Sequence, residues 1–188
     1  MIGAQPFCFS RERLFAIYPN LGSDQEVSVT TTSCKRGVVS RWAIAVGFGG
    51  VFGVSKDAVF FTGGGAEDVI SQDIEPLFRG KTVNGYPPID FSVLADNRST
   101  RLSIHQDTLY FMYPGTDGCR YVLVYSLLYK FWTPWRFGVS PSYLESDMDT
   151  PIPSFLLGGE TTGKSYLIEN AAFSDDGVAI TCVARNGT

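Results

Sequence analysis

A strand-turn-strand unit recurs along this sequence with no helix between its two strands, and this recurrence constrains the fold more than any other feature. The copies lie at residues 51–63, 105–125 and 154–168, and each has two apolar runs separated by a polar or glycine-containing turn. Aligning the central aromatic residues Phe60, Tyr110 and Tyr166 gives spacings of 50 and 56 residues. Four-stranded propeller blades run about 40 to 50 residues each. The repeat predicts an all-β, propeller-like array of antiparallel blades, with a generic β-sandwich as the alternative.

The whole chain, residues 1–188, is expected to form one propeller-type region that is part of a larger protein or assembly. Blade-like units are predicted at about residues 9–63, 89–137 and 154–184. Residues 141–153, with three prolines and no apolar period, are expected to be a loop or blade linker. A closed propeller needs roughly four or more blades. The array therefore has sheet faces that other segments or chains must cover.

One short helix is predicted, at residues 71–78. Ser71 is expected to cap its N terminus, and Asp73 and Glu75 in the first turn would interact favourably with the helix dipole. Pro76 keeps this helix short.

The strand pattern is expected to resume after the helix, at residues 89–95 and 101–104. The middle unit then continues to a cluster of aromatic residues. Trp132, Trp135 and Phe137 are expected to close its outer strand.

Composition limits the classes of function. A hydrophobic content of 44% and an aromatic content of 14% exclude disorder, and 20 glycines with 10 prolines suit tight turns between short strands. The net charge of −4 disfavours a sequence-reading nucleic-acid binder, which needs a concentrated basic face, although the chain could still line a passage through which nucleic acid slides. Residues 42–54, the longest uncharged apolar stretch, contain several glycines and fall short of the roughly 20 residues of a membrane helix.

Two sets of residues are candidates for catalysis or metal binding. His105 is the only histidine, so any Ser-His-Asp or Cys-His mechanism must use it. Asp68, Asp73 and Glu75 form an acidic cluster suited in principle to glycoside hydrolysis or calcium binding. We interpret His105 as an ordinary strand-end residue and two of the acids as helix N-terminal acids. No catalytic, cofactor-binding or metal-binding residue is predicted, and the chain is expected not to be an enzyme.

Cysteines and aromatic residues give two further structural predictions. Cys8, Cys34, Cys119 and Cys182 are far apart and form no Cys-x-x-Cys pair, so they are interpreted as buried reduced thiols in strands. The aromatic series could stack on sugars or bases, but strand spacing favours packing between sheets. Its members are Tyr121, Tyr125, Tyr129, Phe131, Trp132 and Trp135.

Several segments together resemble the propeller repeats of tailed-bacteriophage tail proteins, in particular the short-tail nozzle or hub proteins. The similarity covers residues 9–19, 34–39, 54–61, 70–78 and 121–132. Its chief motifs are the turn Ser55-Lys56-Asp57 and the segment from Ile70 to Glu75, in which Ser71, Asp73 and Ile74 match the pattern.

The resemblance implies a structural virion component of the phage tail, assembled in the bacterial cytoplasm. Its implied partners are other phage tail proteins and further copies in a ring-shaped homo-oligomer. DNA would pass through without sequence-specific binding, and no membrane is involved. The family supplies no catalytic residue or cofactor.

Two alternative functions remain from the residues themselves. A carbohydrate-binding adhesin propeller would be favoured by solvent-accessible Trp132 and Trp135. A glycan-cleaving enzyme, ranked last, would use acids such as Asp73 and Glu75.

Overall fold

The computed structural model describes residues 6–19, 27–93, 100–135 and 141–147, and beyond them the backbone of residues 154–159, 165–168, 174–175 and 178–179. These residues are mostly β. The strands are β1 (Phe7–Phe9), β2 (Leu14–Pro19), β3 (Val27–Thr31), β4 (Ile44–Gly47), β5 (Gly50–Val54), β6 (Val59–Thr62), β7 (Asp68–Val69), β8 (Arg101–His105), β9 (Thr108–Pro114), β10 (Arg120–Ser126), β11 (Trp132–Trp135), β12 (Pro141–Asp147), β13 (Ser154–Gly159), β14 (Ser165–Ile168), β15 (Ser174–Asp175) and β16 (Val178–Ala179).

Helical structure within the described residues is short. Two 3₁₀ turns, η1 (Gln72–Ile74) and η2 (Phe91–Val93), accompany one α-helix, α1 (Glu75–Phe78). The predicted helix at residues 71–78 is therefore confirmed, with its first turn in 3₁₀ form. Pro76 lies in the first turn of α1, where its missing N–H group costs nothing.

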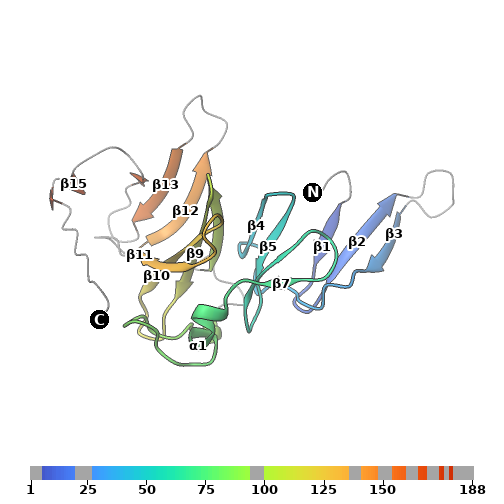
Figure 1. Ribbon diagram of the computed structural model, residues 1–188, viewed down its shortest axis with the longest axis horizontal. Helices are drawn as coiled ribbons and strands as arrows, with labels where there is room; N and C mark the ends of the chain where they lie inside the picture. Colours follow the sequence, from blue (N-terminus) through green and yellow to red (C-terminus); the bar gives the residue numbers. More distant parts are fainter. Residues whose placement is uncertain are drawn as a thin grey trace.

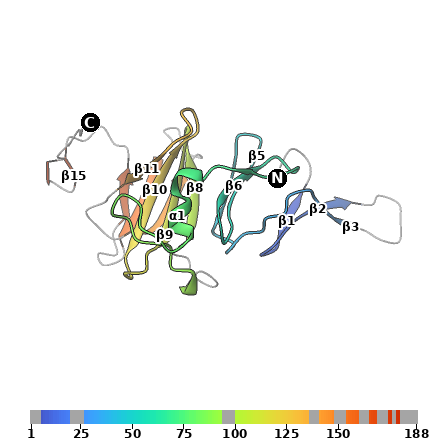
Figure 2. The same ribbon diagram turned by 60° about the horizontal axis from the view of Figure 1, so that its bottom comes forward.

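Every sheet is an antiparallel meander in which strands that follow one another in the chain lie side by side. The orders are β1-β2-β3, β4-β5-β6-β7, β8-β9-β10-β11, β12-β13-β14 and β15-β16. Figures 1 and 2 show the first three of these sheets following one another from right to left in the order of the sequence. The all-β class is confirmed, and no sheet closes into a barrel in the part of the chain described.

Successive sheets pack face to face through three apolar clusters. Phe7, Phe9 and Leu14 of the first sheet pack with Phe60 of the second. A larger cluster, which includes Phe52, lies between the second and third sheets and also takes in α1, seen below them in Figure 1. The third cluster joins the β8–β11 sheet to β12. The second and third sheets are therefore covered on both faces.

The first strands of three successive sheets also lie next to each other. Strand β8 contacts both β4 and β12. On one side, the Leu102 N–H donates to the carbonyl of Trp42, just before β4, at 3.1 Å. On the other side, Arg101 and Glu145 form an ion pair at 3.5 Å. The sheets thus converge along their first strands.

Strand β9 contains the longest unbroken run of buried residues in the part of the chain for which side-chain exposure is described. Its residues Leu109 to Tyr113 are all 0% exposed. Leu109, Phe111 and Tyr113 face the second sheet, whereas Tyr110 and Met112 face β12. An unbroken apolar run of this kind is typical of a strand buried on both faces.

The expected unit at residues 9–63 is divided between two sheets, β1–β3 and β4–β7, and does not form one. The reason lies in the connection between them. The Val38 N–H donates to Ser10 of the first sheet's turn at 3.0 Å, and the next N–H, of Val39, donates to Val54 of the second sheet at 2.9 Å. The chain crosses from one sheet to the other here, because its backbone groups bond to each in turn.

The prediction of a repeated hairpin is confirmed. The alignment of Phe60, Tyr110 and Tyr166 as equivalent residues is wrong by one strand. The three hairpins are β5–β6, β9–β10 and β13–β14, each the second and third strands of its sheet. Phe60 and Tyr166 belong to third strands, whereas Tyr110 belongs to a second strand. Both middle strands of a doubly covered sheet are apolar, so sequence alone offers two equivalent places for the aromatic residue.

Residues 141–147 form strand β12, so the predicted linker at 141–153 is wrong over this part, and the remainder lies outside the described residues. The strand pairs with β13 from Pro141 opposite Gly159 to Asp147 opposite Ser154, with a register shift between Pro141 and Tyr143. Leu144 is buried against the third sheet. Pro141 is tolerated because it begins the strand. The third unit therefore starts before residue 154.

Two smaller predictions are wrong: the strand at residues 89–95 and the capping of the helix by Ser71. Residues 89–93 make an isolated bridge at Ile89 and the turn η2, because Asp90 Oδ1 accepts hydrogen bonds from the Ser92 N–H and hydroxyl. Ser71 does not cap the helix with its side chain. Its Oγ accepts a hydrogen bond from the Val59 N–H at 2.9 Å instead.

Strand β8 (Arg101–His105) and the outer position of β11, with Trp132 and Trp135, agree with the sequence-based expectations. Phe137 lies outside the described residues.

We expect Phe111→Ala to lower the free energy of unfolding by about 3 to 5 kcal/mol, because it opens a cavity in a fully packed strand. The matched control Phe131→Ala removes the same ring from an exposed turn and should change stability by about 0.5 kcal/mol or less. Urea unfolding followed by tryptophan fluorescence measures both. Equal effects would contradict the face-to-face packing of the sheets.

Candidate functional site

The turn Ser55-Lys56-Asp57 is the motif most worth testing for a site, and its side chains are used to close the turn itself. The Ser55 hydroxyl donates to Asp57 Oδ1 at 2.7 Å and accepts from the Ala58 N–H at 3.1 Å. The Ser55 N–H donates to the Ala58 carbonyl at 2.8 Å. The side chain and the backbone of Ser55 therefore supply the hydrogen bonds that close this turn.

Arg36 connects this turn to two other segments. Its Nη1 forms an ion pair with Asp57, and its Nε lies 3.6 Å from Oε1 of Glu67. Glu67 Oε2 also accepts a hydrogen bond from the Lys35 N–H at 3.0 Å. The crossing segment, the β5–β6 turn and the β6–β7 turn are therefore held by one cation and two anions.

Both acids have pKa values below their usual range. Partial burial raises the pKa of Asp57, but hydrogen bonds from Arg36 and Ser55 outweigh it. Burial likewise raises the pKa of Glu67, but the Lys35 N–H and the charge of Arg36 lower it overall. Both acids are therefore charged at neutral pH, as the ion pairs require.

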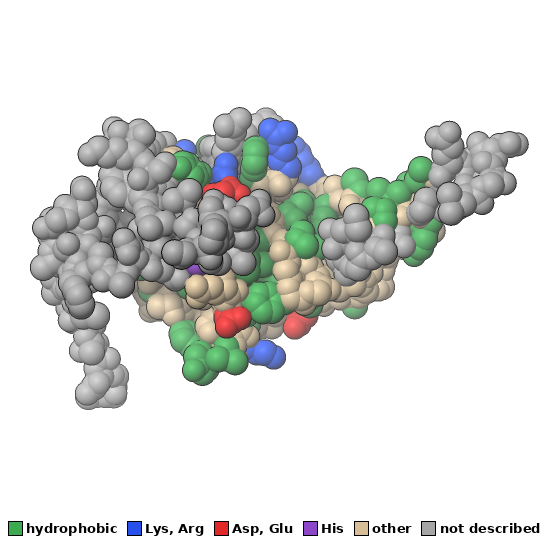
Figure 3. Space-filling view, turned by 90° about the horizontal axis from the view of Figure 1, so that it is seen from above, with side chains coloured by type: hydrophobic (Ala, Val, Ile, Leu, Met, Phe, Trp, Pro, Cys, Tyr) green, Lys and Arg blue, Asp and Glu red, His purple; other side chains and the backbone are tan. Residues whose placement is uncertain are grey.

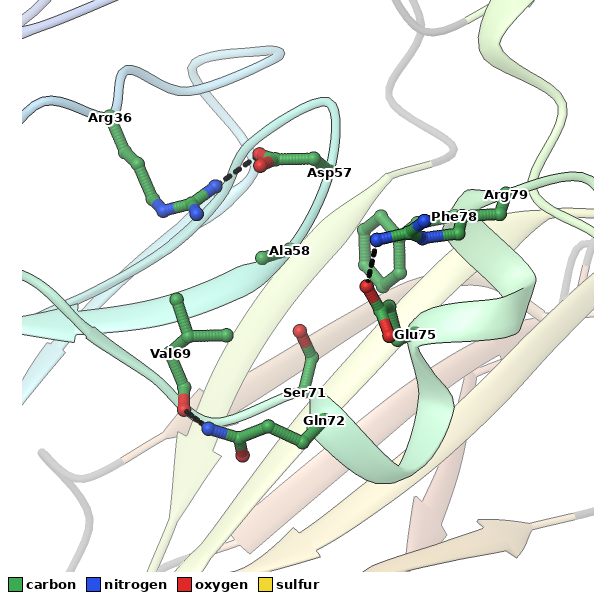
Figure 4. Close-up of a pocket in the computed structure, with 9 residues that line it drawn as sticks. All are labelled: Arg36, Asp57, Ala58, Val69, Ser71, Gln72, Glu75, Phe78 and Arg79. Atoms are coloured by element: carbon green, nitrogen blue, oxygen red, sulfur yellow. Dashed lines mark hydrogen bonds and ion pairs between the residues drawn. The ribbon is translucent and has the colours of Figure 1, made fainter.

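A cleft of about 410 Å³ lies beside this network. Figure 4 shows Arg36 and Asp57 on one side of it and Glu75 and Arg79 on the helix side. Each arginine is paired with an acid, since Arg79 bonds to Glu75. Gln72 Nε2 donates to the Val69 carbonyl at 2.6 Å, which ties η1, the turn that leads into α1, to β7. The lining side chains are thus engaged with one another, and the cleft presents no unpaired cation or nucleophile-base pair.

His105 lies between two sheets, away from this cleft. It is 3% exposed, and its Nδ1 is 3.0 Å from the hydroxyl of Ser146 in β12. Such burial denies a substrate access to the imidazole ring. The geometry fits a packing role at the junction of β8 and β12.

The acidic residues Asp68, Asp73 and Glu75 do not form a metal centre. Within the described part of the chain, no group of three or more His, Cys, Asp or Glu side chains is arranged to hold a metal ion. Glu75 is paired with Arg79. The pKa of the Tyr125 hydroxyl is raised, mainly by burial and further by the negative charges of Asp68 and Asp73.

The cysteine prediction holds only in part. Cys8, Cys34 and Cys119 are free thiols. Cys34 is buried, and burial raises its pKa, but it lies in the segment after β3 and in no strand. Cys8 and Cys119 are exposed, the latter in the β9–β10 turn. Cys182 lies outside the described residues.

Most of the aromatic series packs between sheets. Trp132 Nε1 donates to the carbonyl of Ile70 at 2.6 Å, and its ring lies 5.0 Å from that of Tyr125. The ring of Trp135 stacks on Tyr110 at 5.4 Å. Both tryptophans are therefore partly buried and engaged.

An exposed aromatic pair lies on the β10–β11 turn, where sequence reasoning did not distinguish it from the packed members. Tyr129 is 72% exposed and Phe131 is 48% exposed, beside exposed Leu128. No turn-forming residue type marks this position in the sequence; in the structure Lys130, between the two rings, has the left-handed φ of 57° typical of a tight turn. Tyr129 and Phe131 lie outside the strands on either side of this turn, so the in-and-out alternation of strand side chains does not bury them.

Comparison with known proteins adds no assignment. The sequence matches no family model, and a search of curated proteins found no similar sequence. No helix among the described residues has the length and apolar character needed to cross a membrane.

We expect Arg36→Met to lower the free energy of unfolding by about 1 to 2 kcal/mol at pH 7, because Glu67 loses its charged neighbour. Asp57 is largely exposed and contributes less. The folded-state pKa values of both acids lie below the unfolded ones, so this stabilisation is present above about pH 4.5 and is lost as the pH falls through the folded-state values.

Urea unfolding at pH 7 and pH 3 checks this, with the exposed turn variant Lys56→Met as the control. The destabilisation by Arg36→Met should shrink at pH 3. An effect of the same size at both pH values would show that Arg36 acts by packing alone.

Proposed function

We propose that the chain is a structural β-propeller module of a bacteriophage tail, in the nozzle or hub. The observation that carries the propeller part is the arrangement of β4, β8 and β12, the first strands of three successive sheets, side by side. Propeller blades are antiparallel meanders that pack face to face around an axis lined by their first strands. The sheets β4–β7 and β8–β11 have the four strands of a complete blade.

The oligomer part follows from the number of sheets. A closed propeller needs roughly four or more complete blades, and the sheets at either end of the described stack, β1–β3 and β12–β14, have three strands each. Further segments or copies would complete the ring. A ring-shaped homo-oligomer with other tail proteins as partners satisfies this requirement.

The tail assignment rests on the resemblance of the sequence to nozzle and hub repeats, and the geometry of the motifs is compatible with it. Ser55 and Asp57 close a turn, and Arg36 holds that turn to neighbouring segments. These are structural uses of side chains, as a virion component requires. The proposed location is the virion tail, after assembly in the bacterial cytoplasm.

A role in the DNA-exit conduit is supported by the net charge of −4, since fixed negative charge repels phosphates and prevents adhesion. The net charge already includes the arginines that pair with Asp57, Glu67, Glu75 and Glu145. The repulsion therefore comes from the remaining acids.

Carbohydrate binding is the second candidate, and exposed Tyr129 and Phe131 favour it. Their rings are 6.3 Å apart and could stack on a sugar. The tryptophans first considered for this role are engaged elsewhere. Loss of glycan-array binding on Tyr129→Ala would move the assignment to an adhesin; the tail-scaffold proposal expects no glycan binding. Glycan cleavage has no supporting geometry in the described residues.

The tail proposal predicts a ring with a central opening when the purified protein is imaged by negative-stain electron microscopy, and a matching mass by light scattering. It also predicts that antibodies against this chain label phage particles at the tail end. Labelling of the capsid, or none, would contradict the tail assignment. A monomer or an isolated dimer in both measurements would contradict the ring.

The conduit proposal predicts weak attraction to DNA. Fluorescence anisotropy with a labelled duplex in about 0.15 M salt should show no binding tighter than about 10⁻⁴ M, the weak end of non-specific binding. Micromolar binding that weakens steeply with salt would reveal a basic surface and overturn a non-adhesive conduit.

A further inference from the structure

Strand β3 forms an open edge of the first sheet. It is last in the order β1-β2-β3, so only one side of its backbone is paired among the described strands. The Thr32 N–H donates to the Leu14 carbonyl at 3.1 Å, which fixes the phase of the hydrogen bonds. By the two-residue alternation of an antiparallel ladder, Thr30 and Ser28 also direct their backbone groups toward β2. Val27, Val29 and Thr31 therefore direct theirs to the open side.

The outer strands of the two complete blades are protected against further pairing, and β3 is not. Strand β7 has only two residues, one of them Asp68. Strand β11 contains Pro134, which has no N–H to donate. Strand β3 has five residues, Val27-Ser28-Val29-Thr30-Thr31, with no charge and no proline. Edges of this composition readily pair with another strand.

The side chains along the same edge are apolar and open to solvent. Val27 is 51% exposed and Val29 is 60% exposed. Ile17 is paired directly with Val29, so its side chain lies on the same face. Figure 3 shows hydrophobic side chains on the surface at the end of the molecule where β1–β3 lie. A strand added at β3 would cover the valines as well as the backbone groups.

We propose that two copies of this chain associate through β3, which pairs antiparallel with β3 of the second copy about a two-fold axis at Val29. The outward residues Val27, Val29 and Thr31 are symmetric about Val29. Val29 then pairs with Val29 of the second copy, and Val27 pairs with its Thr31. Each pair exchanges two hydrogen bonds, so every outward N–H and C=O of β3 is satisfied.

A second copy is the occupant that fits this edge, because β3 can pair with itself about Val29 without placing a proline or like charges opposite one another. An isologous contact requires a surface that complements itself, and β3 does so in both hydrogen bonds and side chains. The strand has no charge that would face a like charge across the axis. The result is a continuous sheet of both copies in the order β1-β2-β3-β3-β2-β1. This contact does not depend on the proposed tail function.

Sedimentation velocity over a range of concentrations tests the pairing. The unchanged protein should associate through this contact, and Val29→Lys should weaken that association at least tenfold, since two lysines would face each other across the axis. The control Val46→Lys changes a valine that is 56% exposed on another hairpin and should leave it intact. An unchanged protein that stays monomeric, or equal weakening by both variants, would overturn the proposal.

A cross-link identifies the strand directly and does not rely on loss of association. Val29→Cys is made in a background in which Cys8, Cys119 and Cys182 are replaced by serine. Hydrogen-bonded residues across an antiparallel pair have Cα atoms about 5.5 Å apart, within reach of a short bismaleimide cross-linker. Treatment with this cross-linker should give a covalent dimer with Val29→Cys and little with Val46→Cys. Association without this cross-link would place the contact on another surface and overturn the pairing.

Discussion

The structure depends on the burial of β9 on both of its faces. Leu109 to Tyr113 have no exposed surface, so this strand needs one sheet against each side. The β4–β7 sheet with α1 covers the face of Phe111, and β12 covers the face of Tyr110. Hydrophobic burial is roughly proportional to the apolar area removed from water. The third sheet therefore needs its neighbouring sheets to be stable, and we expect this sheet to be unstable on its own.

Polar side chains then fix how the sheets are connected. Arg36 holds the crossing segment to the β5–β6 and β6–β7 turns, and His105 contacts Ser146 where β8 meets β12. Trp132 bonds to Ile70 and so ties β11 to the segment before the helix. Arginine, histidine and tryptophan side chains, which bind or react with substrates in many other proteins, here hold neighbouring segments together. This use of polar side chains is compatible with the proposed scaffold role.

The sequence predicted the hairpins because strand periodicity and turn residues are local signals. Ser55-Lys56-Asp57 marks a turn whatever surrounds it, and the apolar run at β9 indicates burial on both faces. Assignment of strands to sheets depends on distant contacts, so residues 9–63 were placed in one sheet and residues 141–147 outside any strand. Leu144 is buried only because the third sheet faces it. The same limit applies to the aromatic series, in which neighbours decide that Trp135 packs and Tyr129 is exposed.

Native-state hydrogen exchange, resolved by residue, tests the central claim most directly. The account predicts that the amides of β9 exchange most slowly, near the rate set by global unfolding, because both faces and both edges of this strand are covered. The outward amide of Val29 in β3 should exchange far faster in the monomer. Fast exchange across β9, at rates like those of β3, would contradict a doubly covered sheet and with it the stacking of the sheets.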